Sequence, residues 1–145
     1  KAVYRTRMAL RDGGELIVLT PGVSMYCEDE QNDRLIGRYG YCGREKVLEL
    51  VKTRPDLQHN LSAAAHLIHG SSDGRFGITY ATRLLSEAQV RQIGYDYMPY
   101  DEAARRYDPA ALKEGYNTLP DGERVYYIPN PAVGLWMEKS RLHIP

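Results

Sequence analysis

The sequence predicts an α/β domain, a Rossmann-like three-layer fold in which helices cover both faces of a mostly parallel sheet. Short apolar runs of strand length alternate with segments of helical periodicity, a pattern typical of βαβ units. The 145 residues suit a single domain, 1–145, with a sizeable core, and no internal repeat or low-complexity tract interrupts them. Each element follows from a local signal.

A helix and a buried strand open the chain. Residues 1–12 are in helical register, and Gly13 and Gly14 provide a carboxyl-terminal cap with positive φ. ELIVLT at 15–20 follows as a continuous apolar run, which is typical of a parallel strand buried on both faces. The polar stretch after it contains a short predicted helix near 29–37.

The next predicted helix spans 44–53. Gly43 precedes it, and Pro55 ends it because the residue before a proline disfavours helical φ and ψ. Its apolar side is predicted to consist of Val47, Leu48 and Val51.

Three of the four histidines lie close together in HNLSAAAHLIHG, residues 59–70. A helix over 57–69 places four apolar residues on one stripe that packs against the core. They are Leu57, Leu61, Ala64 and Ile68. His59, His66 and His69 lie on a different, polar face. A transition metal usually needs three or four converging ligands, and His66 with His69 supplies two, so no metal site is predicted here.

The second half of the chain alternates strands with helices. FGITYAT at 76–82 is predicted to be a core strand. Ser86 is a helix cap, and Gly94 ends the helix that it begins. YDYM at 95–98 is the third predicted strand.

Two further helices and a fourth strand of the sheet are predicted from the remaining residues. Asp101 caps a helix through EAARRY, and Pro109 begins another through AALKEGY. Asp121 and Gly122 turn the chain into ERVYYIP, the last strand. Ligands of open parallel sheets bind beyond the carboxyl ends of strands, so PGVSMYC, TRLLS and PNPAVG are the predicted functional loops.

Composition excludes several classes of function. Lysine plus arginine and aspartate plus glutamate number 19 each, which removes the electrostatic case for a nucleic-acid-binding protein and leaves only a local basic patch open. No signal-peptide pattern and no apolar run of about 18 residues is present, so we expect a soluble, cytoplasmic protein that does not contact membranes. Cys27 and Cys42 are expected to be reduced thiols in that compartment.

The sequence carries no complete catalytic constellation. The dinucleotide-binding, phosphate-loop and serine-hydrolase glycine motifs are all missing. The acidic residues Glu28, Asp29, Glu30 and Asp33 are expected to form a solvated helix start, with a divalent-cation site as the alternative. Any active site is therefore expected to be shared with another domain or chain.

One family shares several of these features. KAVYRTRMALRDGGELIVL, the YG at 39–40, the histidine helix and the strand after it resemble the carboxyl-terminal domain of the nickel-pincer lactate racemase family, which includes 2-hydroxyacid racemases and epimerases. The likeness covers most of the 145 residues. Family members carry a lysine about a dozen residues ahead of the paired glycines, and Lys1 precedes Gly13 by twelve.

The resemblance implies one domain of a two-domain isomerase, inactive by itself. An amino-terminal domain of the same polypeptide would bind the nickel-pincer nucleotide, which exchanges hydride with the substrate, and would supply the acid–base histidines. No metal and no cofactor are expected in this domain alone. Lys1 would face a substrate carboxylate or the cofactor phosphate, and His59 and His66 would line the interdomain cleft. Near His59 the family carries an aromatic side chain, so a more polar wall here favours a hydroxylated substrate such as a sugar acid.

Two other functions remain open. ALRDGGELIVL also resembles a segment of Rossmann-type methyltransferases, which need a glycine-rich loop after the first strand that this chain lacks. The twelve tyrosines favour a non-catalytic interaction module, because tyrosine is common at interfaces. The abrupt helical start without methionine predicts a piece of a longer polypeptide, with the mature form of a processed protein as the alternative.

Overall fold

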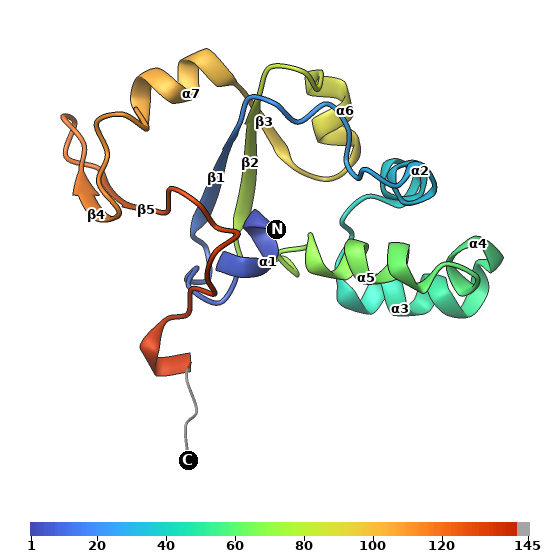
Figure 1. Cartoon of the computed structure of the whole chain (residues 1–145). Helices are drawn as coiled ribbons and strands as arrows, with labels where there is room; N and C mark the ends of the chain where they lie inside the picture. The colour runs from blue at the N-terminus through green and yellow to red at the C-terminus, as the bar shows by residue number, and fades with distance from the viewer. Residues whose placement is uncertain (142–145) are drawn as a thin grey trace.

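The computed structural model describes residues 1–141 and has a mixed α/β fold (Figure 1), which confirms the α/β part of the prediction. Three parallel strands form one sheet in the order β1-β2-β3. They are β1 Glu15–Thr20, β2 Gly77–Thr82 and β3 Asp96–Pro99. Because β2 is central, β1 is an edge strand, and its four apolar residues are half-buried rather than fully buried as predicted.

Helices surround this sheet. They are α1 Ala2–Thr6, α2 Glu30–Tyr39, α3 Arg44–Thr53, α4 Pro55–Gln58, α5 Leu61–His69, α6 Glu87–Gln92, α7 Tyr100–Arg106 and the 3-10 helix η1 Lys139–Arg141. In Figure 1, α2–α5 gather to the right of the strands, whereas α7 lies to the left and contacts all three strands. No helix among residues 1–141 is long and apolar enough to cross a membrane.

The hydrophobic core joins the sheet to α2, α3, α5 and α6. Ile36, Val47, Leu67 and Val90 are each fully buried, one from each of these helices. The central strand adds Ile78, which is 6% exposed. This cluster fixes the helices on one side of the sheet, since burial of apolar surface is the main favourable term in folding.

The predicted helix start at Ser86 is confirmed. The Ser86 Oγ accepts a hydrogen bond from the Gln89 N–H at 3.3 Å, and the Gln89 Oε1 accepts one from the Ser86 N–H at 2.8 Å. This reciprocal capping box satisfies two backbone donors that the helix itself cannot satisfy. The helix predicted near 29–37 is confirmed as α2, and Asp29 caps it.

The predicted histidine helix is interrupted at His59 and Asn60. The Asn60 side chain caps α5, so a new helix begins there with a different register. As a result, part of the predicted apolar stripe is wrong: Leu61 is 63% exposed, and Leu67 is buried in its place. A side chain that prefers a cap position has overridden the apolar periodicity.

The helix predicted over 1–12 is too long. The helix α1 covers only its first half, and Met8 forms a parallel bridge with Met137. The Glu138 N–H donates to the Met8 carbonyl at 3.1 Å. These long-range hydrogen bonds replace the bonds that would have continued the helix, although Gly13 does have the predicted positive φ, 72°.

The predicted fourth strand of the parallel sheet is wrong. ERVYYIP contains β5 Arg124–Tyr127, which pairs antiparallel with β4 Gly115–Thr118 in a separate hairpin. The helix predicted from Pro109 is also wrong: residues 108–112 make a single turn, and β4 begins at Gly115, whose φ of 97° favours glycine.

Two residues of predicted helices lie in positions other than the predicted ones. Leu48, assigned to the apolar side of α3, is 49% exposed, and Leu50 packs against the core instead. Asp101 lies inside the first turn of α7 rather than at its cap, because that helix begins at Tyr100. Val47 and Val51 do lie on the core side of α3 as predicted, so only Leu48 is misassigned there, whereas the error at Asp101 is a shift of a helix end by about two positions.

Candidate functional site

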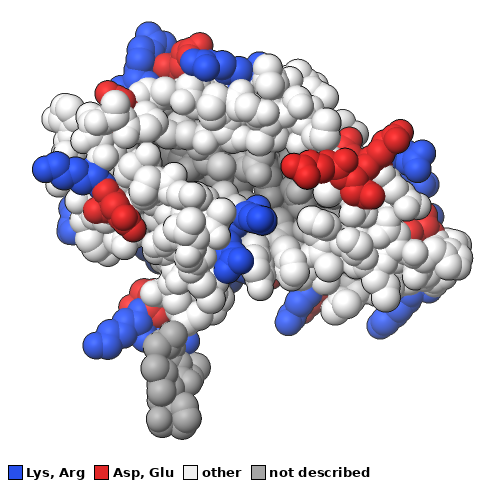
Figure 2. Space-filling view, viewed as in Figure 1, with Lys and Arg blue, Asp and Glu red and all other residues white. Residues whose placement is uncertain are grey.

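Lys1 lies at the start of α1, and its side chain is exposed. Figure 2 shows a hollow on this face of the molecule, with mostly uncharged walls. Lysine and arginine side chains gather at the lower rim, where α1 and the amino terminus lie, and acidic side chains gather to the right (Figures 1 and 2). Lys1 itself is the residue at the amino terminus that is marked in Figure 1, next to α1.

The structure does not bring the three predicted site residues together. His66 and His69 lie in the last turn of α5, and the His69 ring contacts the Tyr4 ring of α1 with 4.4 Å between centroids. This end of α5 is therefore next to the helix that carries Lys1. His59 is exposed just before α5 begins, and a nine-residue helix is roughly 13 Å long.

Asp73 joins α1 to the beginning of α3. One carboxylate oxygen pairs with the Arg7 guanidinium, and the other accepts from the Arg44 N–H at 2.8 Å. The Asp73 N–H in turn donates to the Ser71 Oγ at 2.9 Å. Burial raises the pKa of Asp73, but the Arg44 N–H and the Arg7 guanidinium outweigh burial and leave that pKa below its usual value.

Arg75 holds the segment that follows α1. Its Nη2 donates to the Leu10 carbonyl at 2.7 Å, and its Nη1 donates to the Arg7 carbonyl at 3.3 Å. Its Nε donates to the Asp12 carboxylate at 2.8 Å, and the side chain is only 25% exposed. One guanidinium thus bonds three groups of residues 7–12, as the fork of five donors allows.

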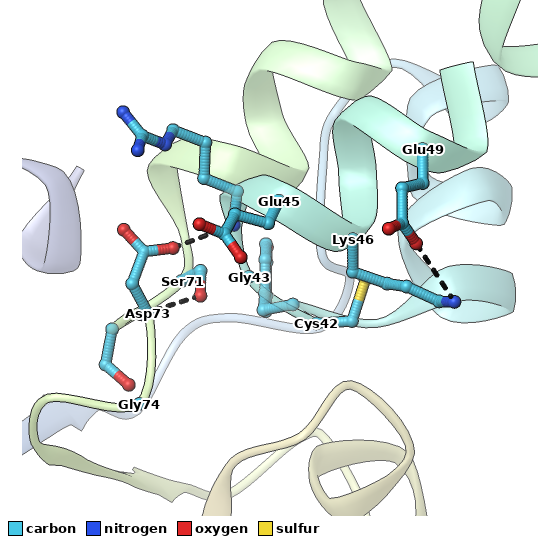
Figure 3. Close-up of a pocket in the computed structure, with 11 residues that line it drawn as sticks. Cys42, Gly43, Glu45, Lys46, Glu49, Ser71, Asp73 and Gly74 are labelled. Atoms are coloured by element: carbon cyan, nitrogen blue, oxygen red, sulfur yellow. Dashed lines mark hydrogen bonds and ion pairs between the residues drawn. The ribbon is translucent and has the colours of Figure 1, made fainter. Parts of the chain in front are cut away.

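A depression of about 810 Å³ lies beside Asp73 and opens on the start of α3 (Figure 3). Residues that line it include Cys42, Gly43, Lys46, Glu49, Ser71 and Asp73. Many of its polar groups already have partners, among them Lys46 with Glu49 at 3.5 Å. Across the described part of the chain, no group of three or more His, Cys, Asp or Glu residues could hold a metal ion.

Two of the three predicted functional loops lie at the carboxyl end of the parallel sheet. PGVSMYC follows β1 and TRLLS follows β2, and the Thr82 hydroxyl donates to the Val23 carbonyl at 3.4 Å between them. The prediction for PNPAVG is wrong, because this loop follows β5 in the separate hairpin. The depression beside Asp73 lies at the other end, ahead of β2.

Sequence patterns missed Asp73 and Arg75. They gave only a turn at Asp73–Gly74, which the structure confirms with positive φ at both residues. The hydrogen-bond partners of the two side chains in the segment around α1 lie 63 to 68 positions away in the chain. No local spacing rule relates residues so far apart.

Comparisons with known proteins bear on the fold. No protein-family model matches the chain, and no curated protein matches it. A solved structure of a Thermotoga maritima protein is similar, with a TM-score of 0.62 and 21% identity over 90% of this chain and 31% of that one. This similarity shows a shared fold, and the present chain spans about a third of the length of that protein.

Proposed function

We propose that this chain is the carboxyl-terminal, substrate-side domain of a cytoplasmic nickel-pincer-type racemase or epimerase of 2-hydroxy acids. In this proposal its strands and helices form a Rossmann-like three-layer domain that closes over a site held mainly by an amino-terminal domain. The observation that carries the proposal is the exposed Lys1 at the start of α1, a helix that contacts the histidine end of α5 through Tyr4 and His69. The T. maritima protein, about three times as long, supports a larger parent polypeptide.

The charges and surface around Lys1 fit a 2-hydroxy acid. The substrate carries a carboxylate at neutral pH, and an ammonium on a flexible stem suits a carboxylate whose position changes during closure. The mostly uncharged hollow would exclude water when it is covered, which strengthens this ionic contact. His66, on the end of α5 next to α1, is the candidate for contacting a further hydroxyl group of a sugar acid.

The nickel-pincer nucleotide would be bound by the amino-terminal domain. In this proposal the chain itself contributes no nickel ligand. When bound, the cofactor supplies the hydride acceptor. The residues described here would bind and orient the substrate and exclude water from it.

The test replaces Lys1 in the intact protein. Lys1→Ala should lower kcat/KM for interconversion of 2-hydroxyacid enantiomers or epimers by about tenfold or more, since a hydrogen bond to a charged group is lost. Lys1→Arg should retain part of the activity. The Tm of both Lys1 variants should equal that of the wild type, because the Lys1 side chain is exposed.

Lys113→Ala is the matched control, because Lys113 is another exposed lysine and precedes the separate hairpin. Its kinetics should equal those of the wild type. The proposal is wrong if Lys1→Ala leaves the kinetics unchanged, or if the nickel-loaded intact protein converts neither lactate nor any sugar acid of a panel.

A non-catalytic interaction module is the second candidate, favoured by the hairpin β4–β5. Tyr116 is 74% exposed and Tyr126 51% exposed, and the two rings meet edge to face with 5.0 Å between centroids. Val133 and Leu135 nearby in the sequence are 78% and 58% exposed. An intact protein without a catalytic domain upstream of Lys1 would favour this candidate.

A further inference from the structure

The helix α1 cannot hold its own position. It has five residues, and isolated helices shorter than about 12 residues are marginal in water. No side chain caps its amino terminus. Its location must therefore come from contacts with the rest of the domain, and Lys1 is displaced whenever α1 is displaced.

Two kinds of contact fix α1. Val3 and Thr6 are 4% and 2% exposed, so one side of the helix is buried. Apolar burial alone resists removal of the helix but only weakly resists its sliding or rotation, because it is non-directional. Direction comes from hydrogen bonds and ion pairs. The Trp136 N–H donates to the Arg5 carbonyl at 2.9 Å within α1, and the side-chain bonds to the segment that follows α1 come mainly from Asp73 and Arg75.

We infer that Asp73 and Arg75, here termed the 73–75 clamp, are positioning residues for Lys1, an inference that rests on the proposed function. Arg75 bonds the carbonyls of Arg7 and Leu10, which lie beyond the last turn of α1 and accept no helical hydrogen bond there. Asp73 pairs with the Arg7 side chain from the same loop. The clamp thus holds both the backbone and a side chain of the segment that leads to Lys1.

The clamp is itself held rigidly. Asp73 has a φ of 53°, an uncommon conformation for a residue other than glycine, and its N–H bonds the buried Ser71. Its second carboxylate oxygen bonds the Arg44 N–H at the start of α3 (Figure 3). Because Asp73 is fixed to α3 and Arg75 directly precedes the core residue Phe76, α1 is positioned relative to the core.

Hydrogen exchange tests whether the clamp sets the position of α1. In Asp73→Asn and Arg75→Gln, the amides of residues 3–9 should exchange about fivefold faster or more, while those in the core part of α5 should not change. Arg75→Lys, which keeps the charge but not the fork, should fall between wild type and Arg75→Gln. Arg91→Gln is the control, because Arg91 pairs with Glu87 and Asp96 instead.

A double-mutant cycle in the intact protein tests whether the clamp acts through Lys1. Asp73→Asn should lower kcat/KM for the 2-hydroxy acid about tenfold when Lys1 is present, but by less than about twofold in the Lys1→Ala background. The inference is overturned if Asp73→Asn lowers kcat/KM by the same factor with and without Lys1. It is also overturned if the amides of residues 3–9 exchange at the wild-type rate in the clamp variants. If the wild type converts no 2-hydroxy acid, the proposed function fails, and the exchange result alone decides whether the clamp positions α1.

Discussion

Leu67→Ala should be the more damaging of two leucine substitutions on the same helix. Leu67 is fully buried in the core cluster, and truncation removes three carbon atoms, worth about 2.4 kcal/mol at 0.8 kcal/mol each. The cavity that remains adds to this, so we expect a loss of about 3 to 4 kcal/mol in the free energy of unfolding. For a chain of this size, that loss lowers Tm by roughly 10 °C.

The matched control is Leu61→Ala, also in α5. Leu61 is 63% exposed, so its truncation should change the free energy of unfolding by no more than about 0.5 kcal/mol. Urea unfolding followed by far-ultraviolet circular dichroism measures both variants. If Leu61→Ala costs as much as Leu67→Ala, the uninterrupted apolar stripe is correct and the register of α5 described here is not.

Three further changes test other parts of the structure. A Cβ on Gly70 would meet the Tyr41 ring at 2.1 Å, so Gly70→Ala should cost about 1 to 3 kcal/mol in urea unfolding, and adding Tyr41→Ala should cost less than the sum of the two single changes. Asn60→Ala removes the cap of α5 and should cost about 1 kcal/mol by the same assay; an unchanged stability would argue against the interruption. Burial raises the pKa of Tyr41 and Tyr95 above the ordinary 10.0, so both keep their protons in the folded state when the unfolded chain has lost them. Stability should therefore be constant just below pH 10 and fall above it, and Tyr41→Phe should make that fall shallower, as unfolding measured across alkaline pH would show.

The sequence predicted correctly those elements that depend on residues close together in the chain. ELIVLT at 15–20 is β1 with the same bounds, because a run of apolar and β-branched residues suits only a few structures. Ser86 begins α6 through a contact only three positions long. The prediction failed where a contact from far along the chain competed, as at Met8, whose bridge to Met137 ends the helical register.

The hairpin β4–β5 shows a different limit. An alternating strand such as ERVYYIP pairs equally well, by its own composition, with a parallel sheet or with an antiparallel neighbour. The chain brings β4 next to it, beginning at Gly115 with a positive φ, and Tyr116 lies opposite Tyr126. PNPAVG was predicted to lie at the parallel sheet because the strand before it was assigned to that sheet.

The residues of the candidate site also differ in whether a local pattern could indicate them. Lys1 is proposed from the resemblance, through its offset to Gly13, and that spacing is a property of one continuous segment. The residues that would give it a fixed position could not be singled out in this way, because Asp73 and Arg75 reach the segment from more than sixty residues away. A flexible cation contributes to turnover only when the backbone that carries it is held in a productive place. A short helix therefore needs such an anchor more than a long one does, and in the proposed function the loop before β2 would belong to the site although it would touch no substrate.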